Sequence, residues 1–97
     1  MASYIFTEQA EQDLAAIIDF TQGRWGKAQA NNYLDNLCTK AQTLADNPAL
    51  GFPREALAAG LLSFPHQSHI IFYLPQPDGI TIVRVLHASV DIAKQFT

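Results

Sequence analysis

Two amphipathic segments follow each other with only a short linker between them, and this arrangement restricts the fold more than any other feature. In the first segment, Ala10 to Thr21, apolar residues recur at the spacing of one helix face, and Gly23 is predicted to end the helix. The second, about Lys27 to Asp46, shows the same periodicity and is stopped by Asn47-Pro48. The linker from Gln22 to Gly26 predicts a sharp reversal, so the two helices should form a hairpin with one shared apolar face.

β-type segments lie on both sides of this hairpin. Ser3 to Phe6 reads as a short strand, and Thr7 as the N-cap of the first helix. After a loop from Asn47 to Gly60, three apolar runs alternate with proline- and glycine-rich turns, which predicts an antiparallel meander. We expect its strands at 61–64, 68–74 and 80–87, its turns at 65–67 and 75–79, and a last short helix or tail at 91–96.

The predicted order is therefore β-α-α-β-β-β in one domain, 1–97. Both helices and strands have apolar faces to bury, so the economical solution packs the hairpin on one face of a small, twisted, mainly antiparallel sheet. The fold class is α+β. The opposite sheet face should stay partly open and is a candidate docking surface.

The last strand, Ile80 to His87, carries the two residues that most suggest chemistry, Arg84 and His87. Regular alternation places Arg84 with the even-numbered residues and His87 with the odd-numbered ones, on opposite sides unless a bulge intervenes. Arg84 is either a structural arginine that meets a carboxylate, for example Asp91, or a phosphate or carboxylate contact. His87 is either a general base or a residue that bonds locally to backbone.

Charge and cysteine content narrow the function. The net charge is −3 and the six basic residues are scattered, so direct gripping of a nucleic-acid backbone is disfavoured. Cys38 is the only cysteine, and with His66 and His69 it lacks zinc-ligand spacing. The interval of three also argues against His66 and His69 sharing a strand face. We predict no metal and no cofactor, since phosphate-loop and dinucleotide motifs are missing from the sequence.

The ends and the aromatic residues add further expectations. The N-terminal stretch lacks the basic and apolar regions of a signal peptide, and the apolar runs are too short for a membrane span, which favours a cytoplasmic protein. Trp25 and Tyr33 are expected to anchor the hairpin core or its rim.

An ordered set of motifs extends over nearly the whole chain. After an aromatic strand come A-x-x-D-L, W-G, Y-x-x-x-L, N-P-x-x-G, H-x-I-F-Y and I-x-R-V-L-H-x-x-x-D. Their residues here are Ala10, Asp13, Leu14, Trp25, Gly26, Tyr33, Leu37, Asn47, Pro48, Gly51, His69, Ile71, Phe72, Tyr73, Ile82, Arg84, Val85, Leu86, His87 and Asp91. This set resembles the ParE branch of the RelE/ParE toxin superfamily, the toxins of bacterial type II toxin–antitoxin modules, also known as plasmid stabilisation proteins.

The resemblance implies one of two activities. RelE-type members are ribosome-dependent mRNA endonucleases that use several lysines and arginines, whereas ParE-type members are understood to trap DNA gyrase. Residues 61–73 here contain no lysine or arginine, and only Arg54, Arg84 and His87 could approximate a nuclease set. One or two arginines stabilise a cleaved phosphate poorly, which favours a gyrase inhibitor over an enzyme. An mRNA interferase and an inactive antitoxin-binding member remain the alternatives.

The resemblance also implies partners. A ParD-like antitoxin would fold a disordered segment along the toxin's apolar surface. DNA gyrase would be the target, and operator DNA would be bound only through the antitoxin. The candidate partner-contact residues are Arg84, Tyr73, His69, Phe64 and Trp25.

Overall fold

The computed structural model describes residues 2–96. In chain order the elements are β1 (Ser3–Phe6), α1 (Glu8–Trp25), α2 (Lys27–Asp46), the 3-10 turn η1 (Pro48–Leu50), β2 (Phe52–Pro53), β3 (Leu62–His66), β4 (His69–Gln76), β5 (Gly79–His87) and α3 (Ile92–Gln95). None of the described helices combines the length and apolarity needed to cross a bilayer.

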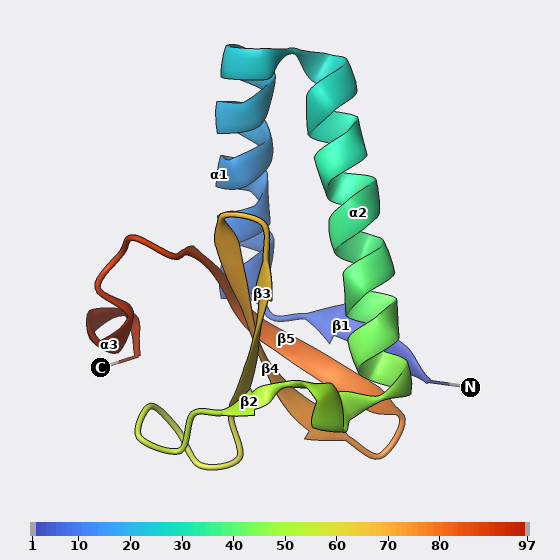
Figure 1. The fold of residues 1–97 in the computed structure, drawn as a ribbon, viewed down its shortest axis with the longest axis vertical. Helices are drawn as coiled ribbons and strands as arrows, with labels where there is room; N and C mark the ends of the chain where they lie inside the picture. Colours follow the sequence, from blue (N-terminus) through green and yellow to red (C-terminus); the bar gives the residue numbers. More distant parts are fainter. Residues whose placement is uncertain (1, 97) are drawn as a thin grey trace.

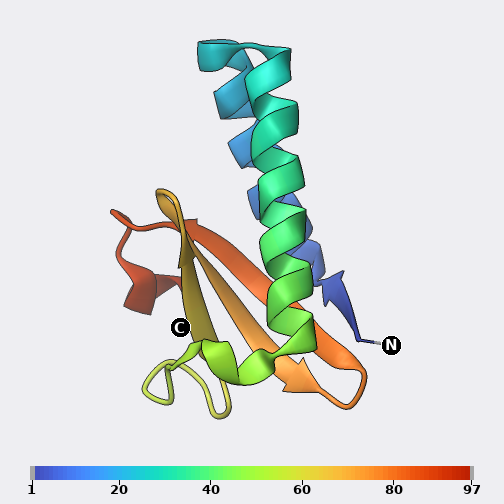
Figure 2. The ribbon, with the colours of Figure 1, turned by 45° about the vertical axis from the view of Figure 1, so that its right-hand side comes forward.

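The helical hairpin covers one face of a five-stranded sheet and extends beyond it (Figures 1 and 2). The strand order is β1-β5-β4-β3-β2, and β2 to β5 form antiparallel pairs. β1 pairs with β5 in parallel, from Ser3 opposite Gly79 to Phe6 opposite Ile82. The predicted α+β class and its hairpin-on-sheet architecture are confirmed. The strand predicted at 80–87 is β5, which lies between β1 and β4.

The first helix is longer than the position of Gly23 predicted. Thr7 caps it as predicted, because its side chain accepts a hydrogen bond from the Ala10 N–H at 3.1 Å. The predicted end at Gly23 is wrong, since α1 continues to Trp25 and Gly26 alone joins the helices. Gly26 has φ 94°, a conformation that glycine adopts without a steric penalty. A hairpin with a one-residue joint carries the last turn of α1 well past the sheet.

The sheet has a core on each face. The larger one packs α1 and α2 against β4 and β5, with Leu37, Leu44, Ile71, Tyr73 and Ile82 fully buried. The smaller lies on the opposite face, around Leu61, Phe72 and Leu86. Leu57 from the loop before β3, and Ile92 and Phe96 at the C-terminal end, cover it. They cover only part of the face that was expected to stay partly open, since their own side chains are half-buried. Figure 2 shows α3 on the side of the sheet away from the hairpin.

A β-bulge in β5 changes which of its side chains share a face. Phe72 pairs with Arg84, but the next residue, Tyr73, pairs with Ile82, so Val83 is the extra residue. Ile82 and Val85 consequently lie in the same core, although strict alternation separates them. Arg84 and His87 still point to different faces, because Arg84 lies opposite Phe72 and His87 lies opposite His69 on the helix side.

The N-P-x-x-G motif is explained by Tyr73. The Tyr73 hydroxyl donates a hydrogen bond to the Pro48 carbonyl at 2.7 Å, and its ring lies directly against Gly51. A Cβ at Gly51 would lie 2.8 Å from the Tyr73 Cζ atom, closer than real contacts allow. Tyr73 is itself fully buried. The motif therefore locks the end of α2 onto β4, and Tyr73 is corrected from a partner-contact residue to a core residue.

Candidate functional site

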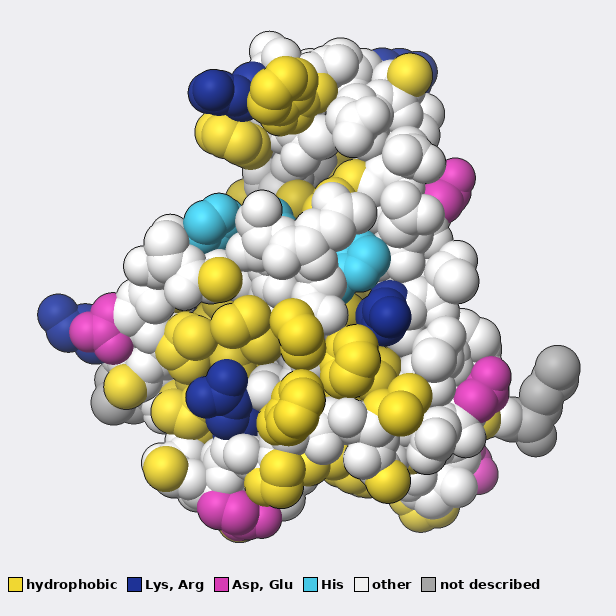
Figure 3. Space-filling model, in the orientation of Figure 1, with side chains coloured by type: hydrophobic (Ala, Val, Ile, Leu, Met, Phe, Trp, Pro, Cys, Tyr) yellow, Lys and Arg dark blue, Asp and Glu magenta, His cyan; other side chains and the backbone are white. Residues whose placement is uncertain are grey.

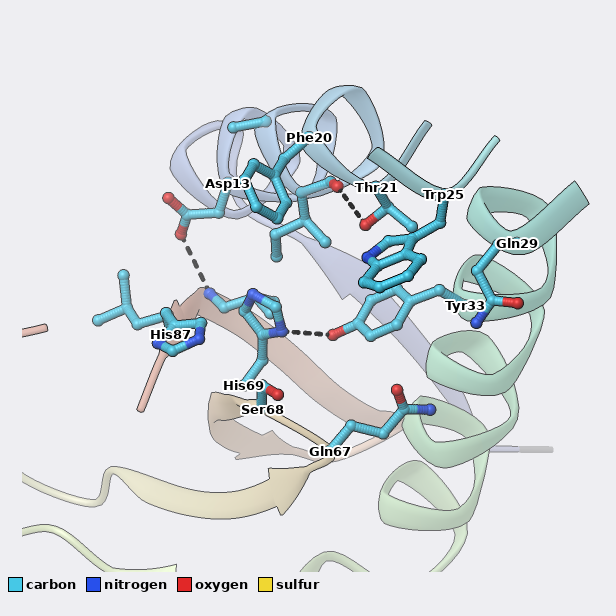
Figure 4. A pocket seen from close by; sticks show the side chains of 14 residues that line it. Asp13, Phe20, Thr21, Trp25, Gln29, Tyr33, Gln67, Ser68, His69 and His87 are labelled. Carbon is cyan, nitrogen blue, oxygen red and sulfur yellow. Dashed lines mark hydrogen bonds between the residues drawn. The ribbon is translucent and has the colours of Figure 1, made fainter. Parts of the chain in front are cut away.

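A groove of about 860 Å³ lies where the hairpin extends beyond the sheet, between the outer turns of α1 and α2 and the adjoining ends of β4 and β5. Its apolar wall includes Ile17, Phe20 and Trp25 from α1 and Val85 from β5. Phe20 and Trp25 are 65% and 64% exposed, so the helix presents two large aromatic rings to solvent. Figure 4 shows both rings beside the cavity. Large exposed aromatic residues that line a groove are typical of a protein-binding surface.

Trp25 was expected in the hairpin core or at its rim, and it instead lines this groove. The reason is that α1 continues for two residues after Gly23, which places Trp25 on the helix rather than in a linker. Arg24 lies over the indole, 5.5 Å from its centroid. Tyr33 is buried as expected, at 7% exposure. Phe20 was not singled out from the sequence, although its position one turn after Ile17 was a usable signal.

Imidazole and phenol rings form a continuous row at the polar end of the groove. Tyr33 contacts the rings of His66 and His69, each at a centroid distance of 5.5 Å, and His69 contacts His87 at 5.2 Å. The Tyr33 hydroxyl and His69 Nδ1 are hydrogen-bonded at 2.9 Å (Figure 4). The Ser89 backbone N–H donates to His87 Nδ1 at 3.1 Å. Figure 3 shows histidine side chains between the hairpin and the sheet.

The expectation that His66 and His69 occupy different faces is wrong. The turn between β3 and β4 contains only Gln67 and Ser68, so the two histidines are direct cross-strand partners. Directly opposed residues of an antiparallel pair point to the same face. Pro65, which suggested the turn, lies inside β3 beyond the end of β2, at an edge where prolines are tolerated.

Burial and the proximity of other charges favour the neutral forms of His66 and His69. Burial lowers the pKa of His69, and the neighbouring His87 and His66 lower it further. Burial also lowers the pKa of His66, with a contribution from Lys40. Burial raises the pKa of Tyr33 to about 12, so the phenol keeps its proton at neutral pH. No group of three or more potential ligands within residues 2–96 could hold a metal ion.

The free energy of unfolding is expected to decrease as the pH falls below about 6.5, because two histidines have folded-state pKa values below that ordinary value. The unfolded chain then binds more protons than the folded one, so this stabilisation is complete above about pH 6.5 and is lost towards the lower folded pKa values. Urea unfolding at pH 7.5, 6.5 and 5.5 measures the effect. A His66→Gln, His69→Gln double variant should show a flatter profile, and an equally steep one would contradict the assignment.

The upper wall of the groove is held by an ion pair between α1 and β5. β1 ends opposite Ile82, so the edge of β5 beyond this residue is not paired with β1. There the Asp13 carboxylate accepts a hydrogen bond from the Val85 N–H at 3.0 Å. Asp13 also binds Arg84 through two parallel hydrogen bonds, 2.7 Å from Nε and 2.9 Å from Nη2. Both side chains are 15% exposed. Asp13, not Asp91, is thus the partner of Arg84, and it raises the Arg84 pKa.

The three residues that could approximate a nuclease set do not come together. Arg84 is held by Asp13, and its Nη1 donates to the Gln95 carbonyl at 3.4 Å. Arg54 donates from Nε to the Ser63 hydroxyl at 2.8 Å, on β3. Two strand spacings, roughly 10 Å, separate β3 from β5. His87 is on the other face, in the groove. Its place near the strand exit and its bond to Ser89 agree with local backbone bonding.

The remaining contact candidates lie in two places. His69 lines the groove beside His87. Phe64 is outside it, stacked on Phe52 at 6.3 Å with Lys40 5.0 Å from its ring centroid. Phe64 belongs to a second apolar area around β2 and β3, visible in the lower half of Figure 3.

Comparison with known proteins agrees with this fold. Residues 4–92 match the family model described as the ParE toxin of the type II toxin–antitoxin system parDE. "Toxin ParE1" of Caulobacter vibrioides is 34% identical over 91 residues, which is 94% of each chain. "Toxin ParE1" of Mycobacterium tuberculosis is 34% identical over 90 residues, 92% of each chain. "Toxin ParE" of Escherichia coli is 31% identical over 93 residues, 95% of this chain and 90% of the relative.

Solved structures show the same architecture. A chain of the chromosomal ParDE toxin–antitoxin system from P. aeruginosa aligns with a TM-score of 0.74 at 20% identity, covering 90% of this chain and 96% of that one. A chain of the E. coli DinJ–YafQ complex aligns with a TM-score of 0.51 at 17% identity, covering 90% and 93%. The family match and the full-length relatives together establish that this chain belongs to the ParE toxin family of type II toxin–antitoxin systems.

Proposed function

We propose that this ParE-family toxin inhibits DNA gyrase without being an enzyme, and that a ParD-like antitoxin neutralises it by filling the groove. The observation that carries the proposal is the lining of the groove. Phe20 and Trp25 offer exposed apolar area, and no lysine or arginine is among the described residues that line it. Cleavage of RNA requires positive groups at the developing phosphate charge. The two arginines that could supply them are hydrogen-bonded elsewhere, Arg84 to Asp13 and Arg54 to Ser63.

An antitoxin segment suits this groove for physical reasons. A disordered segment that orders on binding needs apolar contacts to offset its loss of conformational entropy. The aromatic wall at Phe20 and Trp25 supplies them, and tryptophan is over-represented among residues that dominate binding energy. The protein would act in the cytoplasm, where gyrase and the antitoxin are present.

The experiment has one arm for the target and one for the antitoxin. Purified protein should inhibit gyrase supercoiling and accumulate cleaved DNA, and its induction without antitoxin should arrest growth with filamentation and DNA-damage signalling. Trp25→Ala should weaken binding of the antitoxin encoded beside the toxin by about 2 kcal/mol or more, roughly 30-fold. Phe52→Ala is the matched control, because Phe52 is 59% exposed but does not line the groove.

If the purified protein leaves gyrase activity unaffected, gyrase is not its target. Equal losses of antitoxin affinity in the two variants would contradict the groove as its site. A ribosome-dependent mRNA interferase is the second candidate, favoured by the hydrogen bond between Tyr33 and His69, through which a proton can pass. Cut transcripts in a translating extract would select it, and intact transcripts would exclude it.

A further inference from the structure

We propose that the histidine end of the groove is a receptor for a carboxylate, supplied by an aspartate or glutamate on the apolar partner segment that fills the groove. The inference rests on the proposed function in that it takes the groove as a partner site, and it adds the chemistry by which the partner is recognised. Its groups are His69 and His87, which line the groove with exposed apolar side chains beside them.

Two ring N–H groups at this end are unused within the fold. The Ser89 N–H donates to His87 Nδ1, so the proton of the neutral His87 ring is on Nε2. Tyr33 keeps its phenol proton and can donate it to His69 Nδ1, which places the His69 ring proton on Nε2 as well. Among the described residues, neither Nε2 atom has a hydrogen-bond partner. Both donors belong to side chains that line the groove, so they are available to an acceptor on a ligand.

Among the described residues, the only carboxylate that lines the groove already has partners. The groups packed around them are Tyr33 and Lys40 from α2, His66 from β3, and Asp13 from α1. Asp13 is the only carboxylate that lines the groove among the described residues, and it is already bound to Arg84 and the Val85 N–H. The charges that affect the His69 pKa are the other two imidazoles. Among the described residues, no carboxylate is therefore free to compensate protonation of His69, and one must arrive from outside.

The same arrangement couples binding to proton uptake. An external carboxylate within hydrogen-bond distance favours the charged imidazole and raises its pKa. Affinity must then increase as the pH decreases through the interval between the free and bound pKa values, by up to about tenfold per pH unit for each proton taken up. The apolar wall of the groove would contact the aliphatic part of the ligand, so a long-chain carboxylate should bind. The affinity of the corresponding amine should not increase as the pH decreases.

Octanoate is the probe, and Trp25, the only tryptophan of the chain, is the reporter. We expect octanoate to change Trp25 fluorescence with an affinity about three- to tenfold higher at pH 6 than at pH 8. Octylamine should bind more weakly than octanoate at pH 6 and show no such preference for acid. His87→Gln should remove most of the pH dependence, and because His87 is exposed this variant keeps the fold. NMR of the His69 imidazole should show its lowered pKa rising on octanoate addition.

Arg24→Gln is the matched control, because it removes a positive charge beside Trp25 without removing an imidazole. If Arg24→Gln abolishes octanoate binding and His87→Gln leaves it unchanged, the carboxylate receptor is Arg24 and the proposal is overturned. Binding of octanoate that is independent of pH, or equal binding of octylamine, also overturns it. The assay contains neither gyrase nor antitoxin, so failure of the proposed function and failure of this inference give different results.

Discussion

Replacing Gly79 with alanine is expected to remove a large part of the stability of the protein. Gly79 has φ +145° and lies directly opposite Ser3, where β1 joins β5. A Cβ there would collide with the Ser3 backbone, 2.7 Å from its carbonyl carbon and its nitrogen. The strained backbone conformation costs about 1–3 kcal/mol, and the overlap costs about 1–3 kcal/mol more. Together these terms cost about 2–6 kcal/mol, which is comparable with the lower end of the total stability of a small domain, about 5–15 kcal/mol.

Gly23→Ala is the matched control for this experiment, because the same change is made where the backbone tolerates it. A Cβ at Gly23 meets nothing within 4 Å, and the residue is inside α1. Alanine should stabilise the helix by about 0.5–1 kcal/mol. Thermal unfolding followed by circular dichroism measures both variants. A Gly79→Ala protein with a melting temperature equal to that of the parent would show that β1 does not need to approach β5 this closely.

The second large effect is expected for Asp13→Ala. Three hydrogen bonds are lost at once, and Arg84 and the Val85 N–H are left without their acceptor. Removing one partner of a buried ion pair costs roughly 3–5 kcal/mol. Because each side chain is 15% exposed, we expect about 2–4 kcal/mol from urea unfolding. Asp19→Ala, at an exposed position of the same helix, should change stability by less than about 0.5 kcal/mol.

A double-mutant cycle separates the ion pair from the strand edge. Arg84→Met removes the charge while Asp13 can still accept the Val85 N–H, so it should cost less than Asp13→Ala. Adding Arg84→Met to Asp13→Ala should recover part of the loss, because the unpaired guanidinium is gone. If the two single effects simply add, Asp13 and Arg84 are not coupled, and the ion pair has no role in holding α1 on β5.

Local patterns predicted the helices and strands of this chain well. The bounds of α2 follow from its apolar periodicity and from Asn47-Pro48, and the Thr7 cap follows from its position before an acidic turn. The end of α1 was misplaced because a glycine inside a helix costs only about 1 kcal/mol, which the hairpin contacts offset. The parallel pairing of β1 with β5 is a contact between distant segments, for which local periodicity carries no signal.

The site was harder to predict because it depends on two shifts of register. Val83 is an ordinary strand residue in sequence, so nothing marks the bulge that returns Val85 and His87 to the helix side. The turn at Gln67 and Ser68 lacks a glycine or asparagine, and Gln67 takes the left-handed φ of 55° itself. The row of rings from His66 to His87 can be predicted only when both the bulge and the position of the turn are known. The separation of Arg84 from His87, by contrast, is present with or without the bulge.

The pairing of β1 with β5 also sets when this toxin can become a folded protein during synthesis. Ser3 finds its strand partner at Gly79, so the first strand must wait for almost the whole chain to be translated. Contacts between segments so far apart in sequence slow folding, because a long loop must close before they form. At about 5–20 residues per second, the intervening chain takes several seconds to emerge from a bacterial ribosome. The groove is completed equally late, because Val85, Leu86 and His87 also line it.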